Sequence, residues 1–119
     1  MHILKTEPII ACMIIHTINQ KNELKSWQMI ENVITNMEID IEFVFNYKSS
    51  AMDNTTILVI ACKKQMDKIA LRILHCVGNK LNLKHKDSYG KTALNYATTN
   101  GMKRVAIKIL EIEKSIKNC

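Results

Sequence analysis

Glycine, proline and aromatic residues are scarce in this chain of 119 residues. Three glycines and one proline leave no flexible linker, no low-complexity tract and no visible boundary between domains. Only 5% of the residues are aromatic, so the apolar volume comes mainly from isoleucine, leucine, valine and methionine. Such side chains suit helix packing better than an aromatic-rich β-sandwich. We therefore expect a single domain, residues 1–119, with a helical core.

The four cysteines lack the spacing of a metal site. There is no CxxC pair and no histidine at zinc spacing, so we expect no metal and no cofactor. Ala11-Cys12 and Ala61-Cys62 lie in apolar runs, where a free thiol packs as a small core residue. Cys119 is expected to be an exposed thiol of the tail. Free thiols favour a reducing, intracellular compartment.

The sequence also lacks a membrane span and a catalytic motif. The apolar stretch from Ile9 to Ile15 is about seven residues long, against roughly twenty for a membrane span, and it is short for a signal peptide. The histidines are dispersed and form no recognised catalytic arrangement. We expect no enzyme activity and assign no catalytic residue.

A repeat with an offset of about 36 residues organises the second half of the chain. The segment 56–62, Thr-Ile-Leu-Val-Ile-Ala-Cys, aligns with the segment 92–98, Thr-Ala-Leu-Asn-Tyr-Ala-Thr. Downstream, two apolar quartets align and share the i, i+1, i+4, i+5 spacing of one helical face. Each copy therefore predicts a helix, a short turn and a helix. The quartets are Ile69, Ala70, Ile73 and Leu74, and Val105, Ala106, Ile109 and Leu110.

Local signals predict where the helices begin and end. Asp67 is expected to cap the second helix of the earlier copy, and Gly78 to end that helix in the left-handed conformation. Thr92 stands at a helix start, where a hydroxyl satisfies free amides, and Gly101 fits the turn between two helices. Upstream, Ser26 is expected to act as an N-cap. The predicted helices lie near residues 8–19, 26–36, 56–64, 68–76, 92–99 and 103–113.

Between the two copies, the segment 79–91 alternates around Leu81 and Leu83 and ends in the turn signature Asp87-Ser88-Tyr89-Gly90. This pattern predicts an extended, hairpin-like connection. The basic group Lys84-His85-Lys86 is expected at its solvated tip.

The later copy resembles the ankyrin repeat. The consensus of that repeat is Asp, two residues, Gly, one residue, Thr, Pro, Leu, His, one residue, Ala, Ala, two residues and Gly, followed by Val-Val before a leucine-rich helix. The chain departs from it with Ala93 for proline, Asn95 for histidine and Thr98 for the second alanine. The matching residues are Asp87, Gly90, Thr92, Leu94, Ala97, Gly101, Val105, Ile109 and Leu110.

The earlier copy matches the ankyrin repeat less closely, and the upstream part of the chain matches weakly. The earlier copy keeps Thr56, Leu58 and Ala61, but has Asn54 and Gln65 where the repeat has glycine. Relative to the later connection, residues 43–54 form an insertion. Upstream, Ala11-Cys12 echoes Ala61-Cys62 at a longer spacing, and Trp27 is expected to pack against the helices.

The resemblance implies an all-α ankyrin-repeat solenoid of about three helix-turn-helix repeats with hairpin-like connections. Its parts would be a divergent repeat or cap over residues 1–40, a repeat over 41–78 and a repeat over 79–119. Richness in lysine, isoleucine and asparagine, together with Thr-Ala-Leu-Asn-Tyr-Ala, is similar to the divergent ankyrin proteins of amoebal giant viruses. This similarity implies a viral protein located inside the host cell, in the cytoplasm.

The resemblance also implies a function, because an ankyrin stack binds protein partners with its hairpin tips and inner helix ends. The implied function is a non-catalytic protein–protein interaction module. Tyr89 is the best single anchor, since aromatic residues dominate the energetics of interfaces. Carried over position by position, the partner contacts would be Met52, Asp53, Thr55, Lys63, Lys64, Ser88, Tyr89, Lys91, Thr99 and Asn100.

Two other functions stay open. The net charge of +6 would suit a nucleic acid or an anionic surface if lysines formed one stripe, but the lysines are spread along the chain and arginine is rare. A self-associating structural unit would instead bury Ile107, Ile112 and Ile116 against a second copy. No feature of the sequence decides whether the chain binds another protein or a second copy of itself. The stripe would comprise Lys63, Lys64, Lys84, Lys86 and Lys91.

Overall fold

A computed structural model describes residues 6–117 of the chain, and this part contains seven α-helices and no β-strand. The predicted all-α class is therefore confirmed for these residues. Two short 3-10 helices, η1 (Ser50–Met52) and η2 (Gly78–Lys80), lie in the connections. The α-helices are α1 (Thr6–Asn19), α2 (Glu23–Thr35), α3 (Ile41–Asn46), α4 (Ile57–Lys63), α5 (Asp67–Val77), α6 (Ala93–Thr99) and α7 (Lys103–Lys117).

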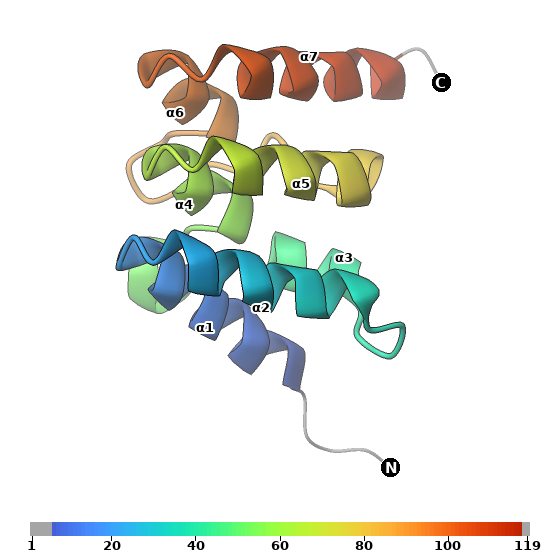
Figure 1. Cartoon of the computed structure of the whole chain (residues 1–119). Coiled ribbons are helices and arrows are strands. Elements are labelled where there is room, and N and C mark those ends of the chain that lie inside the picture. Colours follow the sequence, from blue (N-terminus) through green and yellow to red (C-terminus); the bar gives the residue numbers. More distant parts are fainter. Residues whose placement is uncertain (1–5, 118–119) are drawn as a thin grey trace.

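Six of these helices form three antiparallel pairs that lie on one another as layers (Figure 1). The pairs are α1 with α2, α4 with α5, and α6 with α7. Between layers, α4 contacts both α1 and α6, and α5 contacts both α2 and α7. The hydrophobic core is continuous through all three layers, so the middle pair is buried on two sides. Cys62 is fully buried, as expected for a thiol in an apolar run, and Ala97 is fully buried at the aligned face of α6.

The three turns that join the paired helices have the same backbone conformation. Lys21, Gln65 and Gly101 each have a positive φ, of 61°, 61° and 69°. In each turn, the next amide donates to a carbonyl in the last turn of the preceding helix, as in a Schellman motif. Gln65 therefore keeps the conformation for which the aligned copy uses glycine. The three hydrogen bonds are Asn22 to Thr17 at 3.3 Å, Met66 to Ala61 at 2.9 Å and Met102 to Ala97 at 2.8 Å.

These turns correct the alignment of the first layer. Thr17 occupies the place of Ala61, so the echo of Ala61-Cys62 in Ala11-Cys12 does not mark equivalent positions. Cys12 is exposed rather than packed in the core, so the prediction of a core thiol is wrong at this position. Cys119 lies outside the described residues. Trp27 is half-buried against the core, as predicted.

Threonine caps begin the inner helices of the second and third layers. The Thr56 hydroxyl accepts a hydrogen bond from the Val59 amide at 3.3 Å. The Thr92 hydroxyl accepts one from the Asn95 amide at 3.1 Å, and the Asn95 side chain accepts one from the Thr92 amide at 2.9 Å. This reciprocal pair is a capping box, in which asparagine takes the place of the usual glutamate.

Three predicted helix ends were wrong in detail. The N-cap of α2 is Asn22, whose side chain accepts from the Lys25 amide, while Ser26 is buried and donates to the Asn22 carbonyl at 2.7 Å. Asp67 is the first residue of α5, and no side chain caps that helix. Gly78 does end α5 with a positive φ of 57°, but its ψ of −128° is not that of the left-handed helix.

Helix α3 begins at Ile41 and overlaps the start of the predicted insertion, and the sequence pattern did not indicate it. Asp40 caps α3 by accepting from the Phe43 amide at 3.1 Å. Helix α3 packs on α1, α4 and α5, and Phe45 is almost fully buried. At its end, the Asn46 side chain donates to the Lys80 carbonyl at 2.9 Å and accepts from the Asn82 amide at 2.8 Å. The insertion therefore fastens the chain that enters the third layer.

The connection between α5 and α6 is extended but forms no β-ladder within residues 79–91. Its side chains alternate, with Leu81, Leu83, His85 and Asp87 buried and their neighbours exposed. The chain reverses at residues 87–91, where the Asp87 amide donates to the Lys91 carbonyl at 2.9 Å, so the hairpin-like connection is a turn without strands. The predicted solvated group is confirmed for Lys84 and Lys86, which are exposed, but is wrong for His85, whose ring packs inside with its Nε2 2.7 Å from the Asn54 carbonyl oxygen.

Candidate functional site

The turn before α6 is built around the carboxylate of Asp87. The Gly90 amide donates to the Asp87 carbonyl at 2.9 Å, and Gly90 has a φ of 75°. Asp87 Oδ1 accepts from the amides of Tyr89 at 2.9 Å and Lys91 at 3.0 Å. Its Oδ2 accepts from the hydroxyl of Tyr96 on α6. One buried side chain thus fixes the turn and joins it to the following helix.

The hydrogen bonds of Asp87 also decide its protonation. Burial acts to raise the pKa of the Asp87 carboxyl, but hydrogen bonds from Tyr96, Lys91 and Tyr89 outweigh it, so the pKa lies below its ordinary value. Burial, followed by the hydrogen bond to Asp87, raises the pKa of the Tyr96 hydroxyl. Asp87 is therefore a carboxylate and Tyr96 a neutral donor at neutral pH. These groups hold the turn in place.

The corresponding turn of the second layer lies against the Asp87 turn. Asp53 and Asn54 both have positive φ, of 58° and 59°, although neither is glycine. The Asp53 carbonyl accepts from the Ser88 amide at 2.8 Å, and the Asn54 carbonyl contacts His85 Nε2. The two turns are therefore fastened to one another by the main-chain hydrogen bond from Ser88 to Asp53 and by the contact of the His85 side chain with the Asn54 carbonyl.

Three exposed side chains meet where these turns approach the end of α4, and we call Asp53, Lys63 and Tyr89 the Tyr89 cluster. The Tyr89 hydroxyl donates to Asp53 Oδ2 at 3.4 Å, and Lys63 Nζ lies 5.1 Å from the centre of the Tyr89 ring. Tyr89 nevertheless stays 61% exposed. A cation near the face of an aromatic ring is attracted to that ring electrostatically. The cluster therefore holds a large aromatic surface in one place while leaving it open.

The other residues that were predicted to contact a partner differ in their solvent exposure. Ser88, Lys91 and Thr99 are exposed, whereas Met52 and Lys64 are half-buried. Thr55 is buried, and its hydroxyl donates to the Thr56 carbonyl at 3.0 Å. Because that side chain is closed to a partner, Thr55 does not belong to an exposed surface.

Asn100, one of the predicted partner contacts, forms hydrogen bonds within the protein. Its side-chain amide donates to the carbonyls of Cys62 at 2.9 Å and Lys63 at 3.4 Å. The Gln65 amide also donates to the Cys62 carbonyl at 3.2 Å, so the Asn100 side chain adds a further donor at the end of α4. Asn100 thus joins the inner helices of two layers and fixes the backbone that carries Lys63.

The sequence interpretation missed the roles of His85, Asp87 and Tyr96. The turn signature marks Asp87 for its bonds within the turn, but no local motif marks the contact of Asp87 with Tyr96 or that of His85 with Asn54. One signal was present, because the alternation that begins at Leu81 and Leu83 continues to His85 and Asp87. The alternation predicts that both polar residues point inward.

The residues of the alternative functions are also placed. The lysines of the proposed stripe are exposed, apart from the half-buried Lys64. On α7, Ile107 and Ile116 are exposed, but Ile112 is buried and packs inside the third layer. Ile112 therefore cannot serve a surface for self-association.

Among residues 6–117, no three His, Cys, Asp or Glu side chains gather in a way that could hold a metal ion. None of the helices in this range is long and apolar enough to cross a bilayer. Comparisons of the chain with protein-family models, with curated proteins and with solved structures gave no match.

Proposed function

We propose that this chain is a short ankyrin-repeat solenoid of about three repeats, which binds a protein partner and catalyses no reaction. The proposal rests first on recurring local structure. The Schellman turns at Lys21, Gln65 and Gly101 recur in all three layers, and threonine caps recur at Thr56 and Thr92. The proposed repeats are 1–40, 41–78 and 79–119, with α3 as an insertion in the second.

The Tyr89 cluster is the observation that carries the proposed function. Tyr89 is too exposed to contribute much to the core, yet contacts from Asp53 and Lys63 restrain its ring. A side chain that is ordered before binding loses less conformational entropy when a partner covers it. Aromatic residues in such positions are frequent centres of binding energy. The partner surface would extend from this cluster over Ser88 and Lys91.

A protein partner is favoured over an anionic polymer for an electrostatic reason. Asp53 stands inside the proposed surface, and the nearby Asp87 is ionised, so the lysines there do not form a field of one sign. A nucleic acid would also require several phosphate contacts, which make affinity fall steeply with salt. A protein interface centred on Tyr89 depends less on salt.

The proposal can be tested by affinity capture from cytosolic extract at low and at physiological salt. Wild type and Tyr89→Ala/Lys91→Ala are compared with Lys84→Ala/Lys86→Ala, a matched pair of exposed lysines on the same connection. We expect the wild type and the lysine pair to retain a protein at both salt concentrations and the Tyr89 variant to lose it.

Other outcomes would assign another function. Loss of binding in Lys84→Ala/Lys86→Ala, with capture only at low salt, would indicate an anionic partner. If the chain retains only itself and its mass rises with concentration, the chain is a self-associating unit.

A further inference from the structure

The turn between α6 and α7 contains Asn100 followed by Gly101, the only Asn-Gly pair of the sequence. Asparagine before glycine is prone to spontaneous deamidation, because glycine has no side chain to hinder attack by its own amide nitrogen. In this reaction the Gly101 nitrogen loses its proton and attacks Asn100 Cγ, a carbon–nitrogen bond forms, and the side-chain nitrogen leaves as ammonia. Water then opens the five-membered succinimide ring and yields aspartate or isoaspartate.

Three features of the folded turn oppose this reaction. The Asn100 ψ of 9° nearly eclipses the Gly101 nitrogen with the main-chain nitrogen of Asn100, so the attacking atom points away from the side chain. The Gly101 amide donates to the Thr98 carbonyl at 3.3 Å, which opposes loss of its proton. The side-chain nitrogen of Asn100, the leaving group, donates to the carbonyls of Cys62 and Lys63. The ring can therefore close only after the turn opens and separates from α4.

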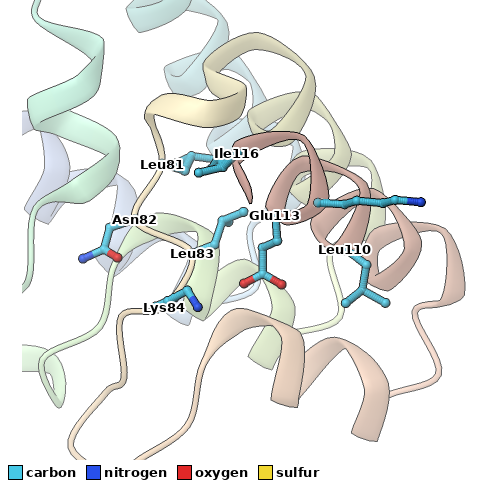
Figure 2. Close-up of a pocket in the computed structure, with 8 residues that line it drawn as sticks. Leu81, Asn82, Leu83, Lys84, Leu110, Glu113 and Ile116 are labelled. Carbon is cyan, nitrogen blue, oxygen red and sulfur yellow. The ribbon is translucent and has the colours of Figure 1, made fainter. Parts of the chain in front are cut away.

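The packing of the third layer allows such an opening. The middle layer packs against helices on both sides, whereas α6 and α7 pack against the helices of one layer only within residues 6–117. On α7, Leu110 and Ile116 are 51% and 45% exposed beside a groove of about 460 Å³, which Leu81 and Leu83 also line (Figure 2). The free energy of local opening falls with the number of buried apolar contacts that are lost. The third layer should therefore open more readily than the middle layer.

Deamidation would prevent the open turn from closing as before. A carboxylate has no proton to donate, unlike the side-chain amide of Asn100. In the closed turn it would face the carbonyl oxygens of Cys62 and Lys63, which lie 2.9 Å and 3.4 Å from the present donor. Isoaspartate would also lengthen the main chain within the turn where the Met102 amide donates to the Ala97 carbonyl. Both products therefore weaken the contact between α4 and α6.

We propose that Asn100 is a site of spontaneous deamidation, which the closed third layer protects and which opening of this layer exposes. Water is the only co-reactant. The modification converts a reversible opening into a lasting weakening of the contact between α4 and α6. This site is independent of any partner at the Tyr89 cluster.

The first test compares the folded chain with the same chain in guanidinium chloride, in the same mildly alkaline buffer. Tandem mass spectrometry of the tryptic peptide 92–103 distinguishes Asn100 from Asn95 and follows the converted fraction with time. Asn100 should convert readily in the denatured chain and at least about a hundredfold more slowly in the folded one, because the rate follows the open fraction. Equal rates, or no conversion in the denatured chain, would overturn the proposal.

Two substitutions on α7 test whether opening of the third layer sets the rate. Ile109 is fully buried, whereas Ile107 is 57% exposed on the same helix. Ile109→Ala should raise the rate at Asn100 about tenfold or more in native buffer, since loss of buried contacts increases the open fraction. Ile107→Ala should leave the rate close to that of wild type. Equal rates for the two variants would overturn the role of the third layer.

The consequence of the modification is measured on the deamidated chain, separated from unmodified protein by ion exchange. Its unfolding midpoint in guanidinium chloride should lie below that of the unmodified chain. Asn100→Asp, which carries the side chain of one product, should shift the midpoint in the same direction. Midpoints equal to that of the unmodified chain would overturn the lasting effect of deamidation.

Discussion

Replacing Asp87 with alanine should destabilise the turn that carries Tyr89. The change leaves the Tyr96 hydroxyl and the amides of Tyr89 and Lys91 without their acceptor. A hydrogen bond to a charged group contributes about 1.5–3 kcal/mol, but water can reach the two amides because the turn is exposed. We therefore expect the free energy of unfolding to fall by about 2–4 kcal/mol, a large part of the roughly 5–15 kcal/mol of a small domain.

Asp87→Asn is the matched control for the charge. Asparagine keeps an oxygen for the two amides, and its amino group can donate to the Tyr96 oxygen. We expect a loss of about 1 kcal/mol, since the hydrogen bonds remain but are no longer charge-assisted. Urea unfolding followed by far-ultraviolet circular dichroism measures both variants. Equal midpoints for wild type and Asp87→Ala would refute the structural role of this carboxylate.

The pH dependence of the same variants tests the ionisation of Asp87. Because its pKa is lower in the folded chain than in the unfolded one, the charged form favours folding. This stabilisation is present above the unfolded value of 3.8 and is lost as the pH falls through the folded pKa. Wild type should thus lose its advantage over Asp87→Asn as the pH falls below the unfolded value of 3.8 and through the lower pKa of the folded chain. Parallel acid profiles of the two proteins would contradict the assignment.

Three further predictions concern the packing between layers. Ala97→Glu should lower the free energy of unfolding by several kcal/mol, on the order of the penalty for a buried unpaired charge, and so unfold the chain. Thr98→Glu, on the exposed side of α6, should change the urea midpoint little. Equal midpoints for the two variants would refute the assignment of Ala97 to the buried face of α6. Gln65→Gly should raise the free energy of unfolding by about 0.5–1 kcal/mol, since glycine adopts a φ of 61° without strain, and an unchanged or lower midpoint would contradict this. Burial raises the pKa of Cys62 to about 12, so this thiol should not react at pH 8, whereas the exposed Cys12 should. Mass spectrometry of the native chain treated with iodoacetamide should therefore find Cys12 alkylated and Cys62 unmodified. Alkylation of both at the same rate would show that Cys62 is accessible to solvent.

The helices of the second and third layers could be predicted because their signals are local and repeated. Thr56 and Thr92 mark helix starts by side chains that bond within one turn, and the apolar quartets keep helical spacing. Gln65 departs from the glycine of the repeat, but the main-chain hydrogen bonds of the turn hold the same conformation. The repeated helix–turn–helix pattern could therefore be predicted although Gln65 stands where the aligned copy has glycine.

Helix α3 and the site could not be predicted in the same way. Helix α3 has six residues, too few to be stable alone, and it depends on its contacts with α1, α4 and α5. His85 appeared to be a polar loop residue, because its partner Asn54 belongs to the neighbouring layer. Asp87 was assigned only to the turn, because its contact with Tyr96 forms when α6 folds against that turn. Tyr89 was found from its position in the turn, but its contacts with Asp53 and Lys63 required the structure.

The most direct test of the proposed binding function is the affinity of the isolated partner, measured by isothermal titration calorimetry against wild type and Tyr89→Ala/Lys91→Ala. Both side chains are exposed, so the melting temperature of the variant should stay close to that of wild type. We predict that the variant binds more weakly by about 1–3 kcal/mol, at low and at physiological salt alike. Equal affinity of the two proteins would place the recognition surface elsewhere on the chain and contradict the role of the Tyr89 cluster.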